Sequence, residues 1–465
     1  MKLKHKNQLT PRSRFGFLQD SRFANNPALV ILISFVLLIL AGAILLTLPI
    51  SSKTNEVTPF INALFTATSA SCVTGLATYD TYEHFSIFGQ VVIMFLIQLG
   101  GLGIVTLTSF FYLVIGKKMG LRTAHLARES VNSDEHLNTS HLIKTVMIAT
   151  FCTELIGALL LLGVFVPEYG GYGVFMSVFF AVSAYCNAGF DLLGIAQPGS
   201  SLITMQHHVG LNLTLCGLII FGGLGFIVWQ DLYNYRKKRK LMLHTKVVLL
   251  ITGLLLLTGW IGTLLLEWDN PNTLGNMPVG QKILHGFVQS VTVRTAGFDS
   301  IGQAGMTKMG KLLSLMLMFI GAAPGSTAGG IKLTTFVVLL MTVLSVSRGE
   351  NETVLFHRRI DKSVVYRSFT VMVMGAVLCC ITAGVLIVTG SSESELDALF
   401  EAVSAFATVG LTVGPTANAD TISKLVMIFT MLFGRVGPVA FALSLSIKGT
   451  TDRKKVLPEG RIWVG

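Results

Sequence analysis

Four short segments of the sequence share a spacing that suits cation binding by backbone oxygens. Each segment has a glycine, a Phe ten residues before it and a large apolar residue directly after it, and the pattern recurs about every 110 residues. The glycines are Gly75, Gly189, Gly297 and Gly410, and three of the four segments also carry Ser six residues before the glycine. Because glycine tolerates a positive φ, a short helix can turn there into an extended chain whose carbonyls face one axis.

Rings of backbone carbonyls replace the hydration shell of a cation in potassium filters. Four short helices that end at such a ring would also direct their partial negative charge toward it. The residues expected to form the ring are Val73, Thr74, Gly75, Asn187, Ala188, Gly189, Thr295, Ala296, Gly297, Thr408, Val409 and Gly410. We expect K⁺ at the level of the four glycines. Only one glycine is common to all segments, so Na⁺ is left open as a second transported ion. The alternative to a cation-binding ring is that the glycines only allow the segments to pack closely.

The composition excludes an ordinary soluble protein. Of the 465 residues, 52% are hydrophobic and 13% are charged, whereas soluble domains carry about 25% charged residues. The mean hydropathy is +0.68, and several apolar runs reach the length of a membrane span. The first run, residues 28–50, is too long for the apolar part of a signal peptide. The six cysteines show no metal-binding spacing, which favours buried reduced thiols.

Long apolar runs flank each of the four segments. The predicted fold class is an all-α polytopic membrane protein, in which four helix–re-entrant pore loop–helix units supply eight transmembrane helices in a pseudo-four-fold arrangement around one pore. The predicted divisions are a cytoplasmic segment 1–27, repeat 1 at 28–115, repeat 2 at 141–236, repeat 3 at 246–348 with a broken second helix (gate loop 321–331), repeat 4 at 364–447 and a cytoplasmic tail 448–465.

The basic residues predict the orientation. Of the 35 Lys and Arg residues, 27 lie between the predicted units or at the chain ends. The positive-inside rule makes these segments, and both termini, cytoplasmic. The net charge of +11 is therefore a sign of topology and does not indicate nucleic-acid binding. No H-E-x-x-H motif and no acid/base pair at helical spacing occurs within an apolar run, so we predict that the chain is not an enzyme.

The apolar run after the third segment is interrupted at residues 321–330, which hold four glycines and a proline. These residues disfavour a helix, by roughly 1 kcal/mol for each Gly and 3 kcal/mol for Pro. Unwound backbone at membrane depth must line a pore or be buried in protein. We expect an intramembrane gate below the carbonyl ring, and the alternative is a static kink. The predicted gate residues are Gly321, Pro324, Gly325, Ser326, Thr327, Gly329, Gly330, Lys332 and Arg435.

Four charged residues fall within or beside apolar segments, where charges are costly and usually functional. We expect Arg435 to lie next to the unwound segment as an electrostatic barrier, and the alternative is an ion pair or a cap on backbone carbonyls. Lys332 either caps the unwound segment or reaches the permeation path. Arg294 is expected to hold the ring backbone by hydrogen bonds. Glu154 is a buried charge and a candidate partner of Arg435.

Together these motifs resemble the Trk/Ktr/HKT superfamily of potassium transporters. The similarity covers residues 28–447 and is closest to bacterial Ktr membrane subunits of the KtrB type. The related TrkH subunits carry two additional N-terminal spans, and their absence here favours the Ktr branch. The motifs that carry the resemblance are residues 71–76 (Ser-Cys-Val-Thr-Gly-Leu), 186–190 (Cys-Asn-Ala-Gly-Phe), 294–298 (Arg-Thr-Ala-Gly-Phe), 407–411 (Ala-Thr-Val-Gly-Leu), 321–330 and 434–437 (Gly-Arg-Val-Gly).

The resemblance implies potassium uptake across the bacterial plasma membrane through one pore per chain. It further implies a homodimer, surrounded by membrane lipid, and a cytoplasmic nucleotide-binding regulatory ring (KtrA-like) as partner. No covalent cofactor is expected, and nucleotide is expected on the partner subunit only. Dependence on Na⁺ is left open by the sequence. The alternative functions are a Trk-type K⁺/H⁺ symporter or a stand-alone K⁺/Na⁺ channel.

Overall fold

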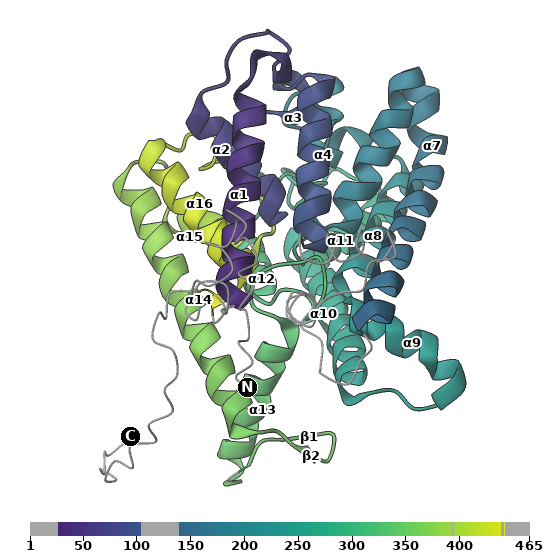
Figure 1. Ribbon diagram of the computed structural model, residues 1–465, viewed down its shortest axis with the longest axis vertical. Coiled ribbons are helices and arrows are strands. Elements are labelled where there is room, and N and C mark those ends of the chain that lie inside the picture. Colours follow the sequence, from purple (N-terminus) through teal and green to yellow (C-terminus); the bar gives the residue numbers. More distant parts are fainter. Residues whose placement is uncertain (1–26, 104–138, 351, 393, 439–440, 442–465) are drawn as a thin grey trace, which may run out of the picture.

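The computed structural model describes residues 27–103, 139–350, 352–392, 394–438 and 441. The described chain is helical apart from one short hairpin (Figure 1). The elements are α1 (Pro27–Thr47), η3 (Pro49–Ser51), α2 (Phe60–Cys72), α3 (Thr81–His84), α4 (Ile87–Leu102), α7 (Thr139–Tyr185), η4 (Leu193–Ile195), η5 (Ser201–Met205), α8 (Val209–Gly223), α9 (Phe226–Lys238), α10 (Leu243–Glu267), α11 (Val279–Thr292), η6 (Gln303–Gly305), α12 (Lys308–Phe319), α13 (Leu333–Ser347), β1 (Val354–Leu355), β2 (Arg358–Arg359), α14 (Lys362–Val388), α15 (Glu395–Ala407) and α16 (Thr421–Val436).

A succession of long helix, short helix and second helix occurs four times. The first succession is α1, α2 and α4, and the last is α14, α15 and α16. In the second, α7 contains both the long and the short helix. The chain bends between these two parts at Gly170 (φ 56°, ψ −135°), three residues after Pro167. The second helix that follows it is a bent pair, since α8 and α9 meet at 90°. In the third, α10 and α11 are followed by α12 and α13, which flank residues 321–330.

Side chains cap the start of the second helix in three of these successions. Ser86, Thr307 and Asp420 each accept a hydrogen bond from the backbone N–H three residues further along. Such caps satisfy one of the four N–H groups that a helix start leaves unpaired. The turns on the side of α3 therefore direct α4, α12 and α16 back across the molecule at defined residues.

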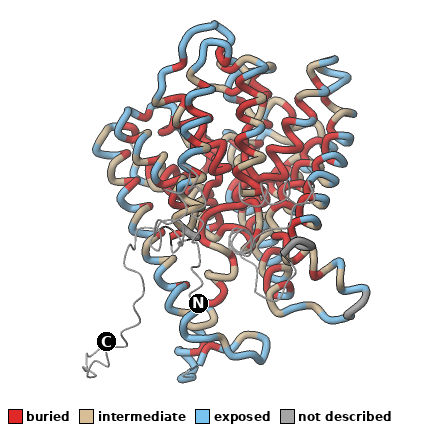
Figure 2. The backbone as a smooth tube through the Cα atoms, in the orientation of Figure 1, coloured by how far each residue is buried: buried red, intermediate tan, exposed pale blue. Residues whose placement is uncertain are grey.

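Contacts between successive sets of helices run around a closed circle. α4 packs against α7, α8 against α11 and α12 against α15, and α16 returns to contact α2. The short helices are buried in the middle of this arrangement, whereas the long helices lie on the outside (Figure 2). Large apolar side chains such as Leu37, Leu155 and Val388 are exposed on the outer helices, which is typical of a surface in contact with lipid.

Four described helices are long and apolar enough to cross a membrane, and the bent pair α8–α9 raises this number to five. The chain is therefore a multi-pass membrane protein. α4 and α13 are apolar but shorter than a span. The eight-span architecture stays a prediction, because the second helices are interrupted or shorter than a span within the described residues.

The basic segments 236–240 and 348–367 extend to one end of the molecule. The end of α9 and the β1–β2 hairpin lie there, opposite α3 (Figure 1). This agrees with the positive-inside reading for these two segments. The predicted N-terminal segment before residue 27, the end of repeat 1 and the tail 448–465 lie outside the described residues.

Candidate functional site: a ring of backbone carbonyls above an unwound segment

Each short helix ends in a left-handed turn, two residues before its glycine. The four residues at this position have positive φ although none is glycine, and the glycines also have positive φ. The values are Val73 58°, Asn187 60°, Thr295 70° and Thr408 52°, followed by Gly75 93°, Gly189 70°, Gly297 82° and Gly410 94°. Positive φ in a β-branched residue is a genuine outlier that the surroundings must hold in place. The sequence pattern located the glycines but gave no sign of the strained residues before them.

The four glycines meet in a closed ring. A Cβ added to any one of them would lie within 3.0 Å of the carbonyl oxygen of the residue before the next glycine. The pairs are Gly75 with Ala188, Gly189 with Ala296, Gly297 with Val409, and Gly410 with Thr74. The same added Cβ atoms would lie 2.9–3.3 Å from the Cα atom of a neighbouring ring glycine. The predicted ring residues of all four segments therefore surround one axis, and no side chain larger than hydrogen fits at the glycine positions.

A hydroxyl group near the end of each short helix binds the backbone close to its glycine. In the first and fourth segments the serine oxygen accepts from the glycine N–H, and in the other two a hydroxyl donates to the carbonyl of the following Phe. The pairs are Ser69 with Gly75 (3.0 Å), Ser404 with Gly410 (3.1 Å), Ser183 with Phe190 (2.7 Å) and Thr292 with Phe298 (2.8 Å). Thr292 supplies the hydroxyl in the segment that lacks the repeated serine.

Acidic residues follow the ring on the side of the outer turns. Asp191 and Asp299 each stand two residues after a ring glycine, and the Asp299 carboxylate accepts hydrogen bonds from the backbone N–H groups of residues 301, 302 and 303. Burial, together with the nearby carboxylates of Asp80 and Asp299, raises the pKa of Asp191 to about 6. This side of the ring is therefore negative at neutral pH, which favours the approach of cations.

The unwound segment, residues 321–330, leaves and re-enters the helices at neighbouring points. Ile320 and Ile331 form a parallel bridge at its base. The Gly321 N–H donates to the Ile331 carbonyl at 2.9 Å, and the Leu333 N–H donates to the Ala322 carbonyl at 3.1 Å. These backbone bonds close the segment into a compact loop between α12 and α13, as its Gly and Pro content predicts.

The unwound segment contacts the ring directly. The Thr327 hydroxyl lies 3.2 Å from the Tyr185 carbonyl and 3.4 Å from Asn187 Oδ1. A Cβ added to Gly329 would lie within 3.0 Å of the Thr408 side chain, so its glycine allows the loop to approach the fourth segment. The predicted gate residues thus lie beside the ring residues of the second and fourth segments.

The second helices of three successions stop at a Gly-x-x-Gly pattern. The first glycine of each pattern touches the end of the short helix of the same succession, because an added Cβ would lie within 3.0 Å of a carbonyl oxygen there. The pairs are Gly100 with Ser71, Gly222 with Tyr185, and Gly434 with Phe406. Three residues later the helix breaks at a second glycine with positive φ, and these break glycines are Gly103 (78°), Gly225 (88°) and Gly437 (91°).

The unwound segment docks on two of these breaks. The Ala323 N–H donates to the Gly223 carbonyl at 3.1 Å, and the Phe226 N–H donates to the Gly325 carbonyl at 2.8 Å. On the opposite side, the Gly330 N–H donates to the Gly434 carbonyl at 3.3 Å. The Gly-x-x-Gly patterns of the second and fourth successions therefore form part of the surface that receives the loop.

Arg435 ties the unwound segment to α4. Its guanidinium donates to the Thr327 carbonyl and to the carbonyls of Gly100 and Gly101, the latter at 2.9 Å. The capping role, which was the alternative for Arg435, is thus present in the structure. Lys332 donates to the Ala328 carbonyl at 2.6 Å, which closes the loop from its other end.

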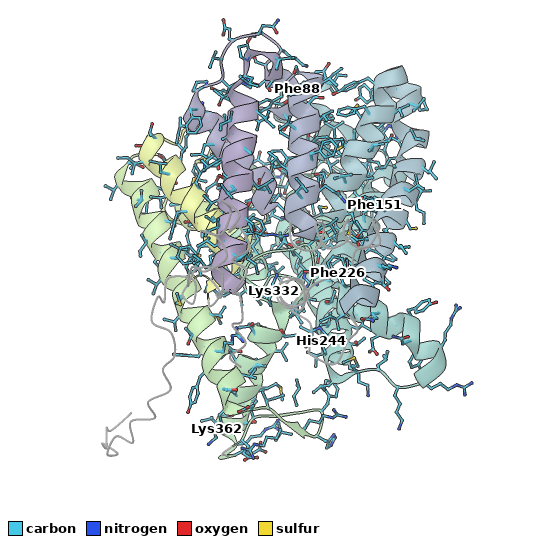
Figure 3. The ribbon with its side chains drawn as sticks, viewed as in Figure 1. Phe88, Phe151, Phe226, His244, Lys332 and Lys362 are labelled. Carbon is cyan, nitrogen blue, oxygen red and sulfur yellow. The ribbon has the colours of Figure 1, made fainter. Side chains whose placement is uncertain are left out.

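Lys332 and Arg435 line one cavity of about 440 Å³ together with Arg367. The cavity lies on the side of the unwound segment that faces α13 and α14, and Lys332 lies near the middle of the molecule, well above Lys362 (Figure 3). The two arginines on the lining of this cavity create a positive potential there. Arg435 can therefore cap backbone carbonyls and also repel cations in the cavity, because one role does not exclude the other.

Two expectations about charged residues need correction. Arg294 donates to the Thr252 carbonyl of α10 at 3.4 Å, and the hydrogen bonds of the described residues include none from its side chain to the backbone of the ring. Glu154 accepts a hydrogen bond from Gln98 at 3.2 Å, and among the described residues no ion pair joins it to Arg435.

Comparison with known proteins assigns the family. The model of the TrkH family, described as "Cation transport protein", matches residues 15–456. The chain belongs to the TrkH family. The family member described here is 41% identical over 445 residues to the "Potassium/sodium uptake protein NtpJ" of Enterococcus hirae, a match that covers 95% of this chain and 97% of the relative. It is 40% identical over 442 residues to the "Ktr system potassium uptake protein B" of Bacillus subtilis, covering 94% and 97%.

A solved structure shares the fold of this TrkH-family chain. The potassium transporter TrkH from Vibrio parahaemolyticus superimposes with a TM-score of 0.68 over 96% of this chain and 87% of the other, at 19% identity. The prediction from sequence motifs that the chain is related to the Trk and Ktr proteins is confirmed.

Proposed function

We propose that this chain takes up K⁺ across the plasma membrane of a bacterium, through a pore in which the ring residues act as a selectivity filter. The observation that carries the proposal is the closed ring of four glycines with carbonyl oxygens at each junction. Rings of this kind replace the hydration shell of a cation without any charged side chain. The relatives' names, which refer to potassium and sodium uptake, support the same substrates.

The unwound segment, with Lys332 and Arg435, is proposed as the gate. Its position directly beside the ring and its glycine-rich backbone support this role, since a loop held by a few backbone hydrogen bonds can move at small cost. Arg435 would act in two ways, holding the closed loop to α4 and repelling cations below the ring. Movement of the loop would release both effects together.

A homodimer and a cytoplasmic nucleotide-binding regulatory ring are proposed as the assembly. The support for the regulatory partner is the name of the Bacillus subtilis relative, which describes one protein of a Ktr system. The homodimer is proposed from the resemblance of the motifs to the Ktr membrane subunits. No covalent cofactor is proposed for this chain, and nucleotide would act on the partner. We also propose that transport depends on Na⁺, which is in line with the name of the Enterococcus hirae relative, "Potassium/sodium uptake protein NtpJ".

The deciding experiment is uptake of K⁺ and of Na⁺ in a bacterium that lacks its own K⁺ uptake systems. The chain is expressed with and without a co-expressed regulatory subunit, at several external Na⁺ concentrations. We expect saturable K⁺ uptake that rises when the regulatory subunit is present. No K⁺ uptake in either case would overturn the function, and K⁺ uptake that follows the proton gradient instead of Na⁺ would favour a K⁺/H⁺ symporter.

The gate is tested by deletion of residues 322–327 and by Arg435→Gln, with tracer K⁺ flux as the measurement. We expect the deletion to raise the flux measured without the regulatory subunit, because the loop no longer lies beside the ring. Arg435→Gln removes the charge and most of the tether, so it should act in the same direction but less strongly. Unchanged flux in both variants, at equal protein levels, contradicts the gate.

A further inference from the structure

A polar cluster lies behind the second segment of the ring, on the side of the surrounding membrane. It consists of Gln98 on α4, Glu154 on α7 and Cys186 at the end of the second short helix. Gln98 Nε2 donates to Glu154 Oε2 at 3.2 Å, and the Cys186 thiol lies 3.7 Å from Gln98 Oε1 and 4.0 Å from Glu154 Oε1. The three side chains therefore contact one another in a closed triangle.

The cluster has apolar surroundings. Glu154 is only 7% exposed, and it lies with Gln98 in a pocket of about 290 Å³ whose other lining residues are apolar. One of them, Phe151, lies on the outer side of α7 (Figure 3). A carboxyl group at this depth is costly, and such groups usually have a functional role. The described salt bridges include none to Glu154, so its recorded partners are the other two members of the cluster.

Cys186 connects this cluster to the ring. It directly precedes Asn187, which has the left-handed conformation of the ring residues. The Asn187 side chain in turn lies 3.4 Å from Thr295 of the third segment and 3.4 Å from Thr327 of the unwound segment. A shift of Cys186 would therefore change the orientation of Asn187 and both of its contacts.

The neighbouring contacts leave Cys186 little freedom. A Cβ added to Gly101 of α4 would lie 2.7 Å from the Cys186 sulfur, so the thiol fills the space that this glycine leaves. One residue earlier, the Tyr185 hydroxyl lies 3.0 Å from Thr150 Oγ1, one turn of α7 before Glu154. The first part of α7 thus holds the end of the second short helix at two successive residues.

We propose that Glu154 is a positioning residue for the second ring segment, which it holds through Gln98 and Cys186. Its role is to fix the geometry of Asn187 and the carbonyl that follows, and so to contribute to discrimination between K⁺ and Na⁺. The corresponding positions in the other segments are Cys72, Arg294 and Ala407, so the four segments are held from behind by different chemistry. This inference rests on the proposed transport function.

The test measures the ratio of K⁺ to Na⁺ transport by purified protein in liposomes. Glu154→Leu should lower the ratio about two- to tenfold, the range expected for residues that act through a shared contact. Glu154→Gln should keep a ratio close to that of the unchanged protein, since an amide also accepts from Gln98. The matched control is Glu168→Leu, an exposed glutamate of the same helix, and it should leave the ratio unchanged.

Two further variants separate positioning from a general loss of structure. Gln98→Leu should lower the ratio as Glu154→Leu does, and the double variant should be no worse than either alone. Cys186→Ala removes the connecting thiol with little change of volume, so it carries the test if Glu154→Leu does not fold. A purely structural role would reduce the yield or thermal stability of these variants and leave the ratio unchanged.

An unchanged ratio in folded Glu154→Leu or, in its place, Cys186→Ala would overturn the inference. So would a Glu154→Gln variant as impaired as Glu154→Leu, because the charge and not the geometry would then matter. Absence of K⁺ transport by the unchanged protein would instead refute the proposed function. The two failures are therefore distinct.

Discussion

Val73, Thr295 and Thr408 are β-branched residues in the left-handed region, where such residues are rare because Cβ crowds the backbone. Each is buried, and each is followed two residues later by a ring glycine. Strain of this kind costs of order 1–3 kcal/mol and persists only where the surroundings impose it. The ring is thus rigid because of its backbone geometry as well as its packing.

The ring glycines should not tolerate a methyl group. In Gly410→Ala the new Cβ would meet the Thr74 carbonyl oxygen and would also have to adopt φ 94°. Overpacking of this sort costs typically about 1–3 kcal/mol, which corresponds to a loss of transport rate of about fivefold or more. K⁺ uptake at matched membrane protein levels measures the effect.

The control for Gly410→Ala is Gly210→Ala. Gly210 lies in α8, has no positive φ and has no atom within 4 Å of an added Cβ. Its substitution should leave uptake unchanged. Equal uptake by the two variants would contradict a functional ring.

Sequence reasoning located the ring glycines because their spacing is fixed by the length of a short helix. It did not find the left-handed residues before them, since three of the four are Val or Thr, which rarely adopt positive φ. It also assigned Arg294 to the ring backbone, whereas the side chain reaches α10. The direction of a long side chain depends on the packing of helices far away in the sequence, which spacing alone does not contain.

At the level of elements, the glycine breaks that end α8 and α16 lie close to where the unwound segment contacts these second helices. Gly225 separates α8 from α9 and has φ 88°, and a Cβ there would lie 2.7 Å from the Pro324 carbonyl oxygen. The glycine thus permits the unwound segment to dock. The interruption at residues 321–330 was predictable from its composition, but the docking surface formed by other glycines was not.

Gly225→Ala should therefore weaken the docking of the unwound segment. We expect K⁺ flux in the absence of a regulatory subunit to rise about two- to tenfold, because the closed position of the loop loses roughly 1 kcal/mol of stability. Tracer flux into liposomes measures this. Gly217→Ala in the preceding helix α8 has no atom within 4 Å of its Cβ and serves as the control. Reduced or unchanged flux in Gly225→Ala would argue against a loop that closes the path.

At the level of the whole molecule, the sequence predicted a helical membrane protein of four related units, and the closed circle of contacts among the helices agrees with it. The predicted number of eight spans is not confirmed by the described helices, of which four or five are long enough to cross a membrane. Bends such as that between α8 and α9 divide an apolar run into shorter helices. Apolar runs in the sequence indicate which segments face lipid or the protein core. They do not record where the backbone bends.

The orientation can be tested by labelling engineered cysteines with a membrane-impermeant maleimide. Glu56→Cys lies in an exposed turn at the end opposite the basic segments and should react in intact cells. Lys240→Cys lies in a basic segment that follows α9 and should react only after permeabilisation. The unsubstituted chain gives the background from its own cysteines. The reverse pattern would place the basic segments outside and refute the predicted topology.

The break glycines Gly103, Gly225 and Gly437 interrupt the helices three residues beyond their contacts with the short helices. Bending at these points would change the docking of the unwound segment but would leave intact the hydroxyl bonds that hold the ring. A partner that pulls on the helix ends beyond these breaks would then act first on the docking of the unwound segment, and so on how often ions pass. Transport rate would accordingly be the property that such a partner controls most directly.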